Sequence, residues 1–215
     1  MDSVLEPPRI LLHHVPIPAA LDPLQESALL ALLPQPRRAA WLRQQDPAAR
    51  TATLCGIDLL CRLAIRAGLA PPRVGDLVYP ERGKPVWRDG PAFSIAHAGG
   101  VVACALAGAS LRLGLDLEPT SRVTARVLRR IASPEELTHC RVLGWSPAEL
   151  WTSKEAVVKA TGAGVFRLAE VRVEAERAQL DGLTFHLLRP ALLTGFACAV
   201  ASDLPLTLEL LPVGD

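Results

Sequence analysis

Two segments of this chain carry the full set of signals that start an α-helix. In "SPEE", Ser133 supplies a hydroxyl cap, Pro134 a preset first-turn backbone and Glu136 the carboxylate of a capping box. The same pattern recurs from Ser146. The second helix should end at Gly162, because glycine readily adopts the left-handed backbone that closes a helix. Two helices are therefore expected in the second half of the chain.

Short segments on both sides of these helices predict strands. Strands are expected in 9–15, 77–87, 91–108 (two strands around a glycine turn), 112–118, 170–175, 183–188, 195–202 and 206–211, and further helices in 22–33 and 47–67. This order predicts an α+β fold. We place the boundary between two subdomains near its midpoint, giving an N-terminal subdomain 1–108 and a C-terminal subdomain 109–215.

Composition narrows the classes of protein to which the chain can belong. The 215 residues are 50% hydrophobic and carry a formal net charge of +1, which excludes a broad basic surface for nucleic acid. The N-terminus does not resemble a signal peptide, and the longest apolar run, 101–111, is too short to cross a bilayer. Five cysteines without a CxxC pair favour reduced thiols. We expect a soluble, cytoplasmic protein.

Lysine is rare in this chain, and its positions are informative. Of 23 basic residues, three are lysines and the rest are arginines. Genomic base composition accounts for an arginine excess, but it does not explain why Lys84, Lys154 and Lys159 all fall in motif-like segments. Because lysine is a compact point charge and arginine a planar fork, we treat these lysines as candidate site residues.

The segment "GLDLE" places two carboxylates on one face of a strand. Side chains alternate along a strand, so Asp116 and Glu118 share a face while Leu115 and Leu117 share the other. Two neighbouring carboxylates repel each other unless a positive group lies between them. A divalent cation such as Mg²⁺ meets that need with oxygen ligands. The alternative is an exposed strand face paired with arginines.

The helix "WTSKEAVVKATG" adds a third carboxylate. Glu155 and Lys159 are four residues apart and therefore lie on one helix face. They could form an ordinary surface ion pair, which stabilises a protein by only a few tenths of a kcal/mol. Alternatively, Glu155 could ligate a cation whose shell is completed by substrate phosphates, with Lys154 and Lys159 neutralising the remaining charge.

Two further segments could contact an anion. His97 precedes a glycine pair in "FSIAHAGG", where the backbone can approach a ligand closely and the imidazole can donate to phosphate. A structural histidine is the alternative. Lys84 in "RGKP" is either a solvated turn lysine or a phosphate contact.

In this order, "RGKP", "FSIAHAGG", "GLDLE" and "WTSKEAVVKATG" resemble the 4′-phosphopantetheinyl transferases of the surfactin-synthetase-activating type. The resemblance implies two similar subdomains related by a pseudo-twofold axis, with coenzyme A in the cleft between them. It implies transfer of the phosphopantetheine arm of coenzyme A to a serine of an apo acyl or peptidyl carrier protein, with release of adenosine 3′,5′-bisphosphate. A chain that contains both halves is expected to act as a monomer.

The resemblance also implies roles for individual residues. Asp116, Glu118 and Glu155 would hold Mg²⁺, Lys159 would bind the attacked phosphate, and Glu155 would deprotonate the serine directly or through water. The implied coenzyme A contacts are Arg37, Arg38, Arg50, Lys84, Ala96, His97, Lys154 and Lys159. Family members often carry serine at the position of Ala96, so here only its backbone N–H could contact phosphate.

The expected carrier-docking surface lies between Pro119 and Trp145. Leu128, Ile131, Val142 and Leu143 would offer apolar contacts, and Arg126, Arg129 and Arg130 would meet acidic carrier residues. The alternative is that the apolar residues belong to the core. Two other functions compete with transfer: a non-catalytic coenzyme A-binding module, and a metal-dependent phosphohydrolase, which the lack of dense Asp and His clusters disfavours.

Overall fold

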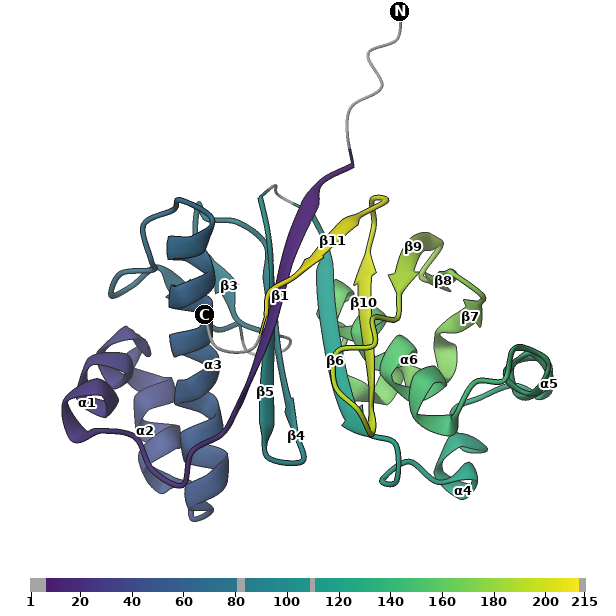
Figure 1. The fold of residues 1–215 in the computed structure, drawn as a ribbon, viewed down its shortest axis with the longest axis horizontal. Coiled ribbons are helices and arrows are strands. Elements are labelled where there is room, and N and C mark those ends of the chain that lie inside the picture. Colours follow the sequence, from purple (N-terminus) through teal and green to yellow (C-terminus); the bar gives the residue numbers. More distant parts are fainter. Residues whose placement is uncertain (1–6, 81–83, 109–110, 213–215) are drawn as a thin grey trace, which may run out of the picture.

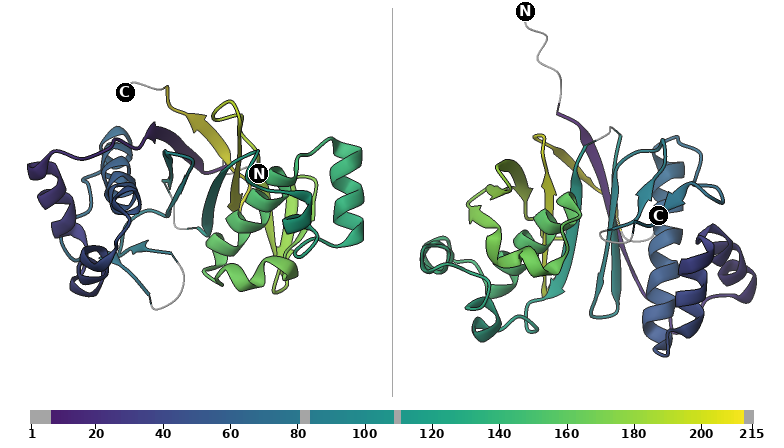
Figure 2. Two further views of the ribbon diagram at one scale, coloured as in Figure 1. Left: turned by 90° about the horizontal axis from the view of Figure 1, so that it is seen from below. Right: turned by 180° about the vertical axis from the view of Figure 1, so that it is seen from behind.

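Two β-sheets meet face to face at the centre of the molecule, and a long helix covers the outer face of each sheet (Figures 1 and 2). This computed structural model describes residues 7–80, 84–108 and 111–212. The α+β architecture predicted from the sequence is confirmed in these ranges.

The first sheet has the strand order β11-β1-β5-β4, in which only the β1–β11 pairing is parallel. Helix α3 packs on its outer face through a cluster of buried leucines and isoleucines. The elements of this half are β1 (Arg9–Pro16), α1 (Pro23–Leu32), α2 (Gln35–Arg43), α3 (Pro47–Arg66), β2 (Leu77–Val78), β3 (Val86–Trp87), β4 (Phe93–Ala98) and β5 (Val101–Ala107).

The second sheet has the strand order β6-β10-β9-β8-β7, and helix α6 packs on its outer face. Its elements are β6 (Leu113–Pro119), α4 (Ala125–Leu128), α5 (Pro134–Leu143), α6 (Pro147–Thr161), the 3₁₀ helix η1 (Val165–Glu170), β7 (Arg172–Glu174), β8 (Arg177–Leu180), β9 (Leu183–Leu188), β10 (Phe196–Ser202) and β11 (Thr207–Leu210). The last strand, β11, leaves this half and pairs with β1 in the first sheet.

The helix ends follow the signals in the sequence. Asp22 caps α1 by accepting from two backbone N–H groups. Ser133 and Ser146 both form the predicted capping boxes, which confirms the starts of α5 and α6. Gly144 and Gly162 end these helices with positive φ.

Four elements, α2, α4, η1 and β8, are absent from the sequence prediction. The prolines at 34 and 36 resemble loop signals, yet the second occupies the first turn of α2, where proline is well tolerated. Arg82 and Gly83 of the "RGKP" segment, between β2 and β3 in the chain, lie outside the described residues. Strands β2 and β3 themselves are paired as expected.

Small and apolar side chains fill the space between the two sheets. The interface cluster contains mainly alanine, valine and leucine side chains of β1, β4, β5, β6 and β10. One buried polar contact crosses it: the backbone N–H of Leu115 donates to Ser94 Oγ at 3.0 Å. The sheets are therefore held in a fixed relation by an apolar core and at least one directional bond.

Strand β6 and helix α6 approach each other unusually closely. A Cβ atom added to Gly114 would lie 1.8 Å from the carbonyl oxygen of Ala156 and 2.7 Å from the backbone nitrogen of Ala160. Only glycine fits here, because the obstructing atoms are helix backbone and cannot rotate away. Gly114 thus sets the distance between the strand and the helix that carry the candidate carboxylates.

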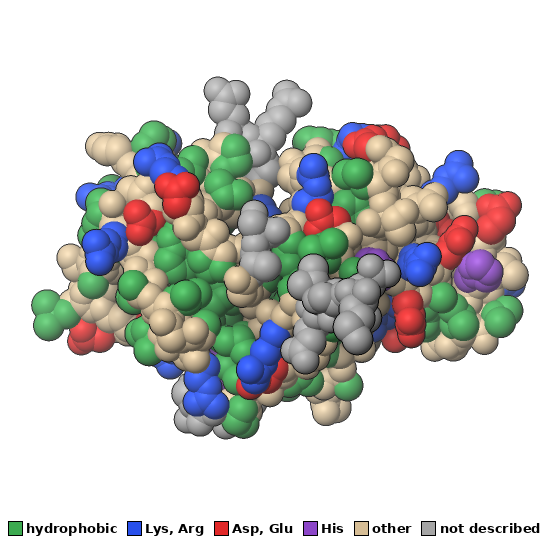
Figure 3. Space-filling model, turned by 90° about the horizontal axis from the view of Figure 1, so that it is seen from above, with side chains coloured by type: hydrophobic (Ala, Val, Ile, Leu, Met, Phe, Trp, Pro, Cys, Tyr) green, Lys and Arg blue, Asp and Glu red, His purple; other side chains and the backbone are tan. Residues whose placement is uncertain are grey.

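Within the described residues, no helix is both long enough and apolar enough to cross a membrane. On the face shown in Figure 3, basic and acidic side chains are interspersed, with apolar side chains between them.

We predict that Gly114→Ala destabilises the protein by about 3 kcal/mol, because the new methyl group must push α6 away from β6. Gly108→Ala is the matched control, since open space surrounds Gly108 and its effect should stay within about 1 kcal/mol. Urea unfolding of both variants measures the difference. Equal stability of the two variants would contradict the close contact.

Candidate active site

The carboxylates of β6 face helix α6, as the strand alternation predicts. Leu115 and Leu117 point into the core between the sheets. Gly114, on the other face of the strand, touches the backbone of α6. Asp116 and Glu118 share that second face, so the predicted alternation is confirmed.

Asp116 pairs with a lysine of α6. Lys159 Nζ donates to Asp116 Oδ1 at 2.6 Å, and the Asp116 side chain is only 8% exposed. The second oxygen, Asp116 Oδ2, is buried and accepts no hydrogen bond. A buried carboxylate oxygen without a partner is costly, so this atom is poised to accept from a ligand or to bind a cation.

Glu155 projects from α6 toward the same group of charges. Burial is the main cause that raises its pKa to about 7, and repulsion from Asp116 and Glu118 adds to the shift. Attraction to Lys159 opposes it. A carboxylate that titrates near neutral pH can exchange a proton with a substrate hydroxyl.

Glu118 lies at the outer end of the group. Its Oε2 accepts from Arg122 Nη1 at 3.3 Å. Burial and the neighbouring Asp116 raise the pKa of Glu118, while Arg122 lowers it. The three acidic groups therefore sense one another electrostatically, as parts of one site.

His97 of β4 and Lys84, which precedes β3, also interact with the charge of Lys159. Burial and the positive charge of Lys159 lower the pKa of His97, and Asp116 raises it, so His97 lies within reach of both charges. Lys84 is also coupled to Lys159, and burial lowers its pKa to about 8. Lys84 Nζ donates to the carbonyl of Phe93 in β4 and, at 2.6 Å, to that of Leu113 in β6. This lysine thus joins β4 of the first sheet to β6 of the second, within reach of the charge of Lys159.

The structure does not bring Lys154 to these charges. Its side chain is fully buried, and its ammonium group bonds to Glu136 and to the carbonyl of Val171. The coenzyme A contact predicted for Lys154 is therefore blocked in this arrangement, because the helix turns its side chain toward α5 and β7 instead.

The other predicted coenzyme A contacts are placed in the first half. Arg38 donates to the carbonyls of Ala31 and Leu33 and so closes the end of α1. Arg50 stacks over Trp41, with 5.2 Å between the guanidinium carbon and the ring centre. Arg37 lies 4.9 Å over the ring of Tyr79, beside a cavity of about 710 Å³. These contacts do not link the arginines to the carboxylates.

One sequence prediction needs correction, and another is left open. The Ala96 side chain is 2% exposed and lies in the core between the sheets, so the predicted contact of Ala96 rests on its backbone N–H alone and stays a prediction. In the predicted docking surface, Leu128 is 3% exposed and Ile131 packs against the core, as the alternative interpretation held. Val142 and Leu143 are exposed on α5.

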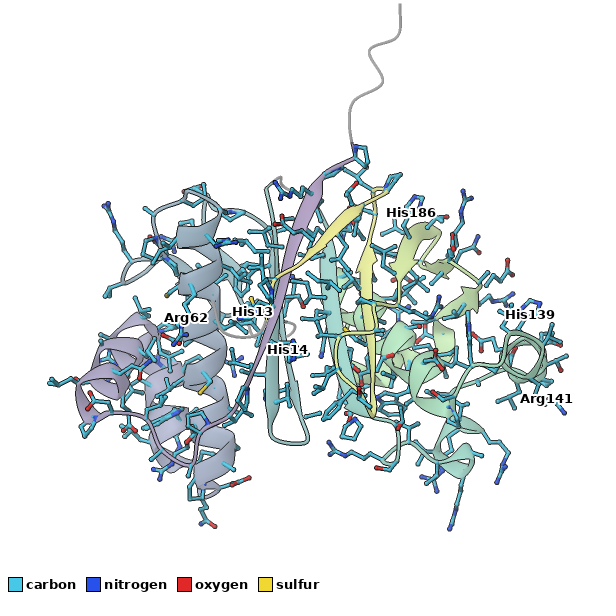
Figure 4. The ribbon with its side chains drawn as sticks, viewed as in Figure 1. His13, His14, Arg62, His139, Arg141 and His186 are labelled. Carbon is cyan, nitrogen blue, oxygen red and sulfur yellow. The ribbon has the colours of Figure 1, made fainter. Side chains whose placement is uncertain are left out.

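The other histidines lie on separate elements. Figure 4 shows His13 and His14 on β1, His139 on α5 and His186 on β9. They supply no further ligand to the group formed by Asp116, Glu118 and Glu155.

The acidic group fits a divalent cation chemically, but its ligands are not preassembled. Asp116 Oδ2 is a buried oxygen without a partner, and the mutual repulsion of three carboxylates would be relieved by a cation. Among the described residues, however, no three acidic, histidine or cysteine side chains already converge on one point. Lys159 occupies the other oxygen of Asp116, so side-chain movement must accompany cation binding.

This part of the chain also has known relatives. Residues 112–201 match the 4′-phosphopantetheinyl transferase superfamily. The 4′-phosphopantetheinyl transferase HetI of Nostoc sp. is 32% identical over 108 residues, which cover 44% of this chain and 45% of the relative. The chain thus matches less than half the length of that relative. The superfamily domain contains both β6 and α6, and so all three candidate carboxylates.

Two residues of the superfamily domain were missed in the sequence. Gly114 controls the approach of β6 to α6, and a glycine inside a predicted strand was the available signal. Arg122 pairs with Glu118, but no local pattern distinguishes it from the many other arginines.

We predict that Glu155→Gln stabilises the protein at alkaline pH. The folded pKa near 7 lies above the ordinary value of 4.5, so the folded state binds the extra proton more tightly. Ionising Glu155 therefore costs the wild-type protein folding stability. This cost is absent below pH 4.5 and grows as the pH rises through 7. The variant should melt roughly 2 to 8 °C higher than the wild type at pH 8, and no higher at pH 4.5.

Melting curves of the two proteins across this pH range test the prediction. The exposed Glu174→Gln variant on β7 is the control and should show no such pH-dependent gain. A gain for Glu155→Gln that is greatest at acidic pH would contradict the raised pKa.

Proposed function

We propose that this chain transfers the 4′-phosphopantetheine arm of coenzyme A to a serine of an apo acyl or peptidyl carrier protein. The observation that carries the proposal is the grouping of Asp116, Glu118, Glu155 and Lys159 between β6 and α6, inside the matched span 112–201. The surfactin-synthetase-activating type, with its pseudo-twofold relation between halves, is the variant that the motifs favour.

The reaction sets clear demands on the site. The serine oxygen forms a bond to the phosphorus that carries the pantetheine arm, and the bond from that phosphorus to the bridging oxygen breaks. Adenosine 3′,5′-bisphosphate leaves, and the serine proton must go to a base. Negative charge on the pyrophosphate must also be neutralised for the nucleophile to approach.

The residues at the site meet these demands. Glu155 accepts the serine proton, directly or through water, because its pKa near 7 suits a general base. Lys159 moves from Asp116 to the attacked phosphate, a contact that a flexible lysine can exchange. Asp116, Glu118 and Glu155 would hold Mg²⁺, which neutralises pyrophosphate charge when bound.

The first sheet supplies the other end of the coenzyme A site. In this proposal His97 and Lys84 contact the 3′-phosphate, and Lys84 exchanges its bonds to the carbonyls of Phe93 and Leu113 for that contact. Arg37, with Tyr79 and Arg88, lines the cavity of about 710 Å³, where a ring and two cations suit a nucleotide. Arg38 and Arg50 hold that region together through α1 and Trp41.

The carrier docks on α4 and α5 in this proposal. Three arginines are exposed along α4 and the turn after it: Arg126, Arg129 and Arg130. Acidic helices of the carrier protein would complement their charge. Val142 and Leu143 on α5 provide the exposed apolar contact, with exposed fractions of 77% and 46%. We expect a cytoplasmic monomer, because one chain contains both halves of the site.

We predict that Asp116→Asn and Glu155→Gln each abolish transfer, with a loss of at least about a hundredfold, while the protein still folds. The assay mixes the enzyme, coenzyme A, Mg²⁺ and an apo carrier, and detects the added arm by intact mass. Glu26→Gln on α1 is the control and should remain fully active. Robust transfer by either site variant would remove the assignment of these carboxylates.

A non-catalytic coenzyme A-binding module is the alternative. Such a module would use Lys84 and His97 but would not need the three carboxylates. Calorimetric titration of the wild type with coenzyme A, with and without Mg²⁺, separates the two functions. A coenzyme A affinity that is the same with and without Mg²⁺, together with no arm transfer to any carrier, would favour the non-catalytic module.

The docking proposal makes a separate prediction. Reversing the charges in Arg129→Glu/Arg130→Glu should raise the apparent KM for the carrier roughly tenfold or more, because an attractive surface becomes repulsive. The KM for coenzyme A should not change. Arg177→Glu on the distant strand β8 is the matched control. Equal losses for both substrates would count against this docking surface.

A further inference from the structure

A buried ion pair joins helix α6, which carries Glu155 and Lys159, to helix α5. Lys154 Nζ lies 2.8 Å from Glu136 Oε1 and 2.9 Å from Glu136 Oε2, and it donates to the carbonyl of Val171 at 2.5 Å. The Lys154 side chain is 0% exposed and that of Glu136 is 9% exposed. All three protons of the ammonium group therefore have acceptors within the protein.

Glu136 is equally well satisfied. Besides Lys154, its Oε2 accepts from the backbone N–H of Ser133 at 2.8 Å, and its Oε1 from that of Val173 at 2.9 Å. The pair thus joins three elements: the start of α5, the middle of α6 and strand β7. A buried ion pair is tolerable when its hydrogen bonds are complete, and removing one partner leaves a costly buried charge.

The position of the pair along α6 gives it a consequence for the site. Lys154 immediately precedes Glu155, and consecutive helix residues point about 100° apart. Lys154 therefore anchors one side of α6 to α5 and β7 while Glu155 faces β6. Any rotation of α6 that displaced Glu155 would break the bonds of Lys154. The ion pair also fixes α5, which stands at the outer edge of this half (Figure 1).

We propose that Lys154 and Glu136 are positioning residues that lock α6 to α5 and β7, and so hold Glu155 and the α5 surface in register. This assigns Lys154 a role within the protein instead of a contact with phosphate. The catalytic part of the inference rests on the proposed transferase function, whereas the structural part does not.

The experiment compares Lys154→Met, Glu136→Gln and the double variant with the wild type. Lys154→Met leaves a buried carboxylate without its cation and should lower Tm on the order of 10 °C. Glu136→Gln should lower Tm less. The double variant removes both charges and should melt above Lys154→Met, a recovery that independent effects cannot produce.

Function and local order provide the remaining readouts. In Lys154→Met, hydrogen exchange should accelerate in α5 and β7, and arm transfer should fall by about tenfold or more because Glu155 is displaced. The Kd for coenzyme A should stay within about threefold of the wild-type value. Arg167→Met, which breaks the exposed pairs of Arg167 with Glu170 and Asp181, is the matched control and should change none of these properties strongly.

If Lys154→Met folds, either of two results would overturn the proposal. The first is an unchanged Tm in Lys154→Met. The second is a loss of coenzyme A affinity in Lys154→Met as large as its loss of transfer, with Glu136→Gln unaffected, because that pattern identifies Lys154 as a phosphate ligand. If Lys154→Met does not fold, unaltered hydrogen exchange of α5 in Glu136→Gln would overturn the proposal, and faster exchange would support it. If the wild type transfers no arm, the proposed function fails, while Tm and exchange still decide the structural role.

Discussion

The contact of β6 with α6 at Gly114 is the constraint on which the candidate site depends. Helix backbone lies where a side chain would otherwise stand, so the strand and the helix meet at the shortest distance that two backbones allow. Asp116 is two residues after Gly114 on the strand, and Glu155 and Lys159 each precede one of the two alanines of α6 that Gly114 meets. The short distance between the backbones lets these side chains reach one another. The 2.6 Å pair of Asp116 and Lys159 is a direct result.

The same proximity concentrates charge. Three carboxylates share a largely buried space with one lysine of α6, and each carboxylate is harder to ionise as a result. The ionised form of a side chain is often destabilised in this way at sites that bind a charged ligand. Lys159 offsets part of the repulsion, and its positive charge also lowers the pKa of His97 and of Lys84. Asp116 Oδ2 has no hydrogen-bond partner, so groups within the protein compensate the buried negative charge only in part.

Much of this arrangement could be predicted from the sequence because local rules determine it. The capping boxes of α5 and α6 and the alternation along β6 depend only on neighbouring residues, and they placed Asp116, Glu118, Glu155 and Lys159 correctly on their elements. Lys154 differs because its environment is set by residues far away in the chain. The sequence suggested that Lys154, next to Glu155, is a phosphate ligand. In the structure Lys154 is buried and donates to Glu136, which lies 18 residues earlier. Likewise, the periodic pattern of 206–211 indicated a strand but not which sheet it would join.

The final strand has a consequence for how the molecule assembles. Strand β11 pairs in parallel with β1, from Arg9 opposite Thr207 to Leu12 opposite Leu210. The first sheet therefore receives this edge strand only after all strands of the second sheet have been synthesised. Until then β1 offers an open side to other chains, a known route to misassembly. Completion of the first sheet therefore depends on a segment that follows every strand of the second sheet in the chain.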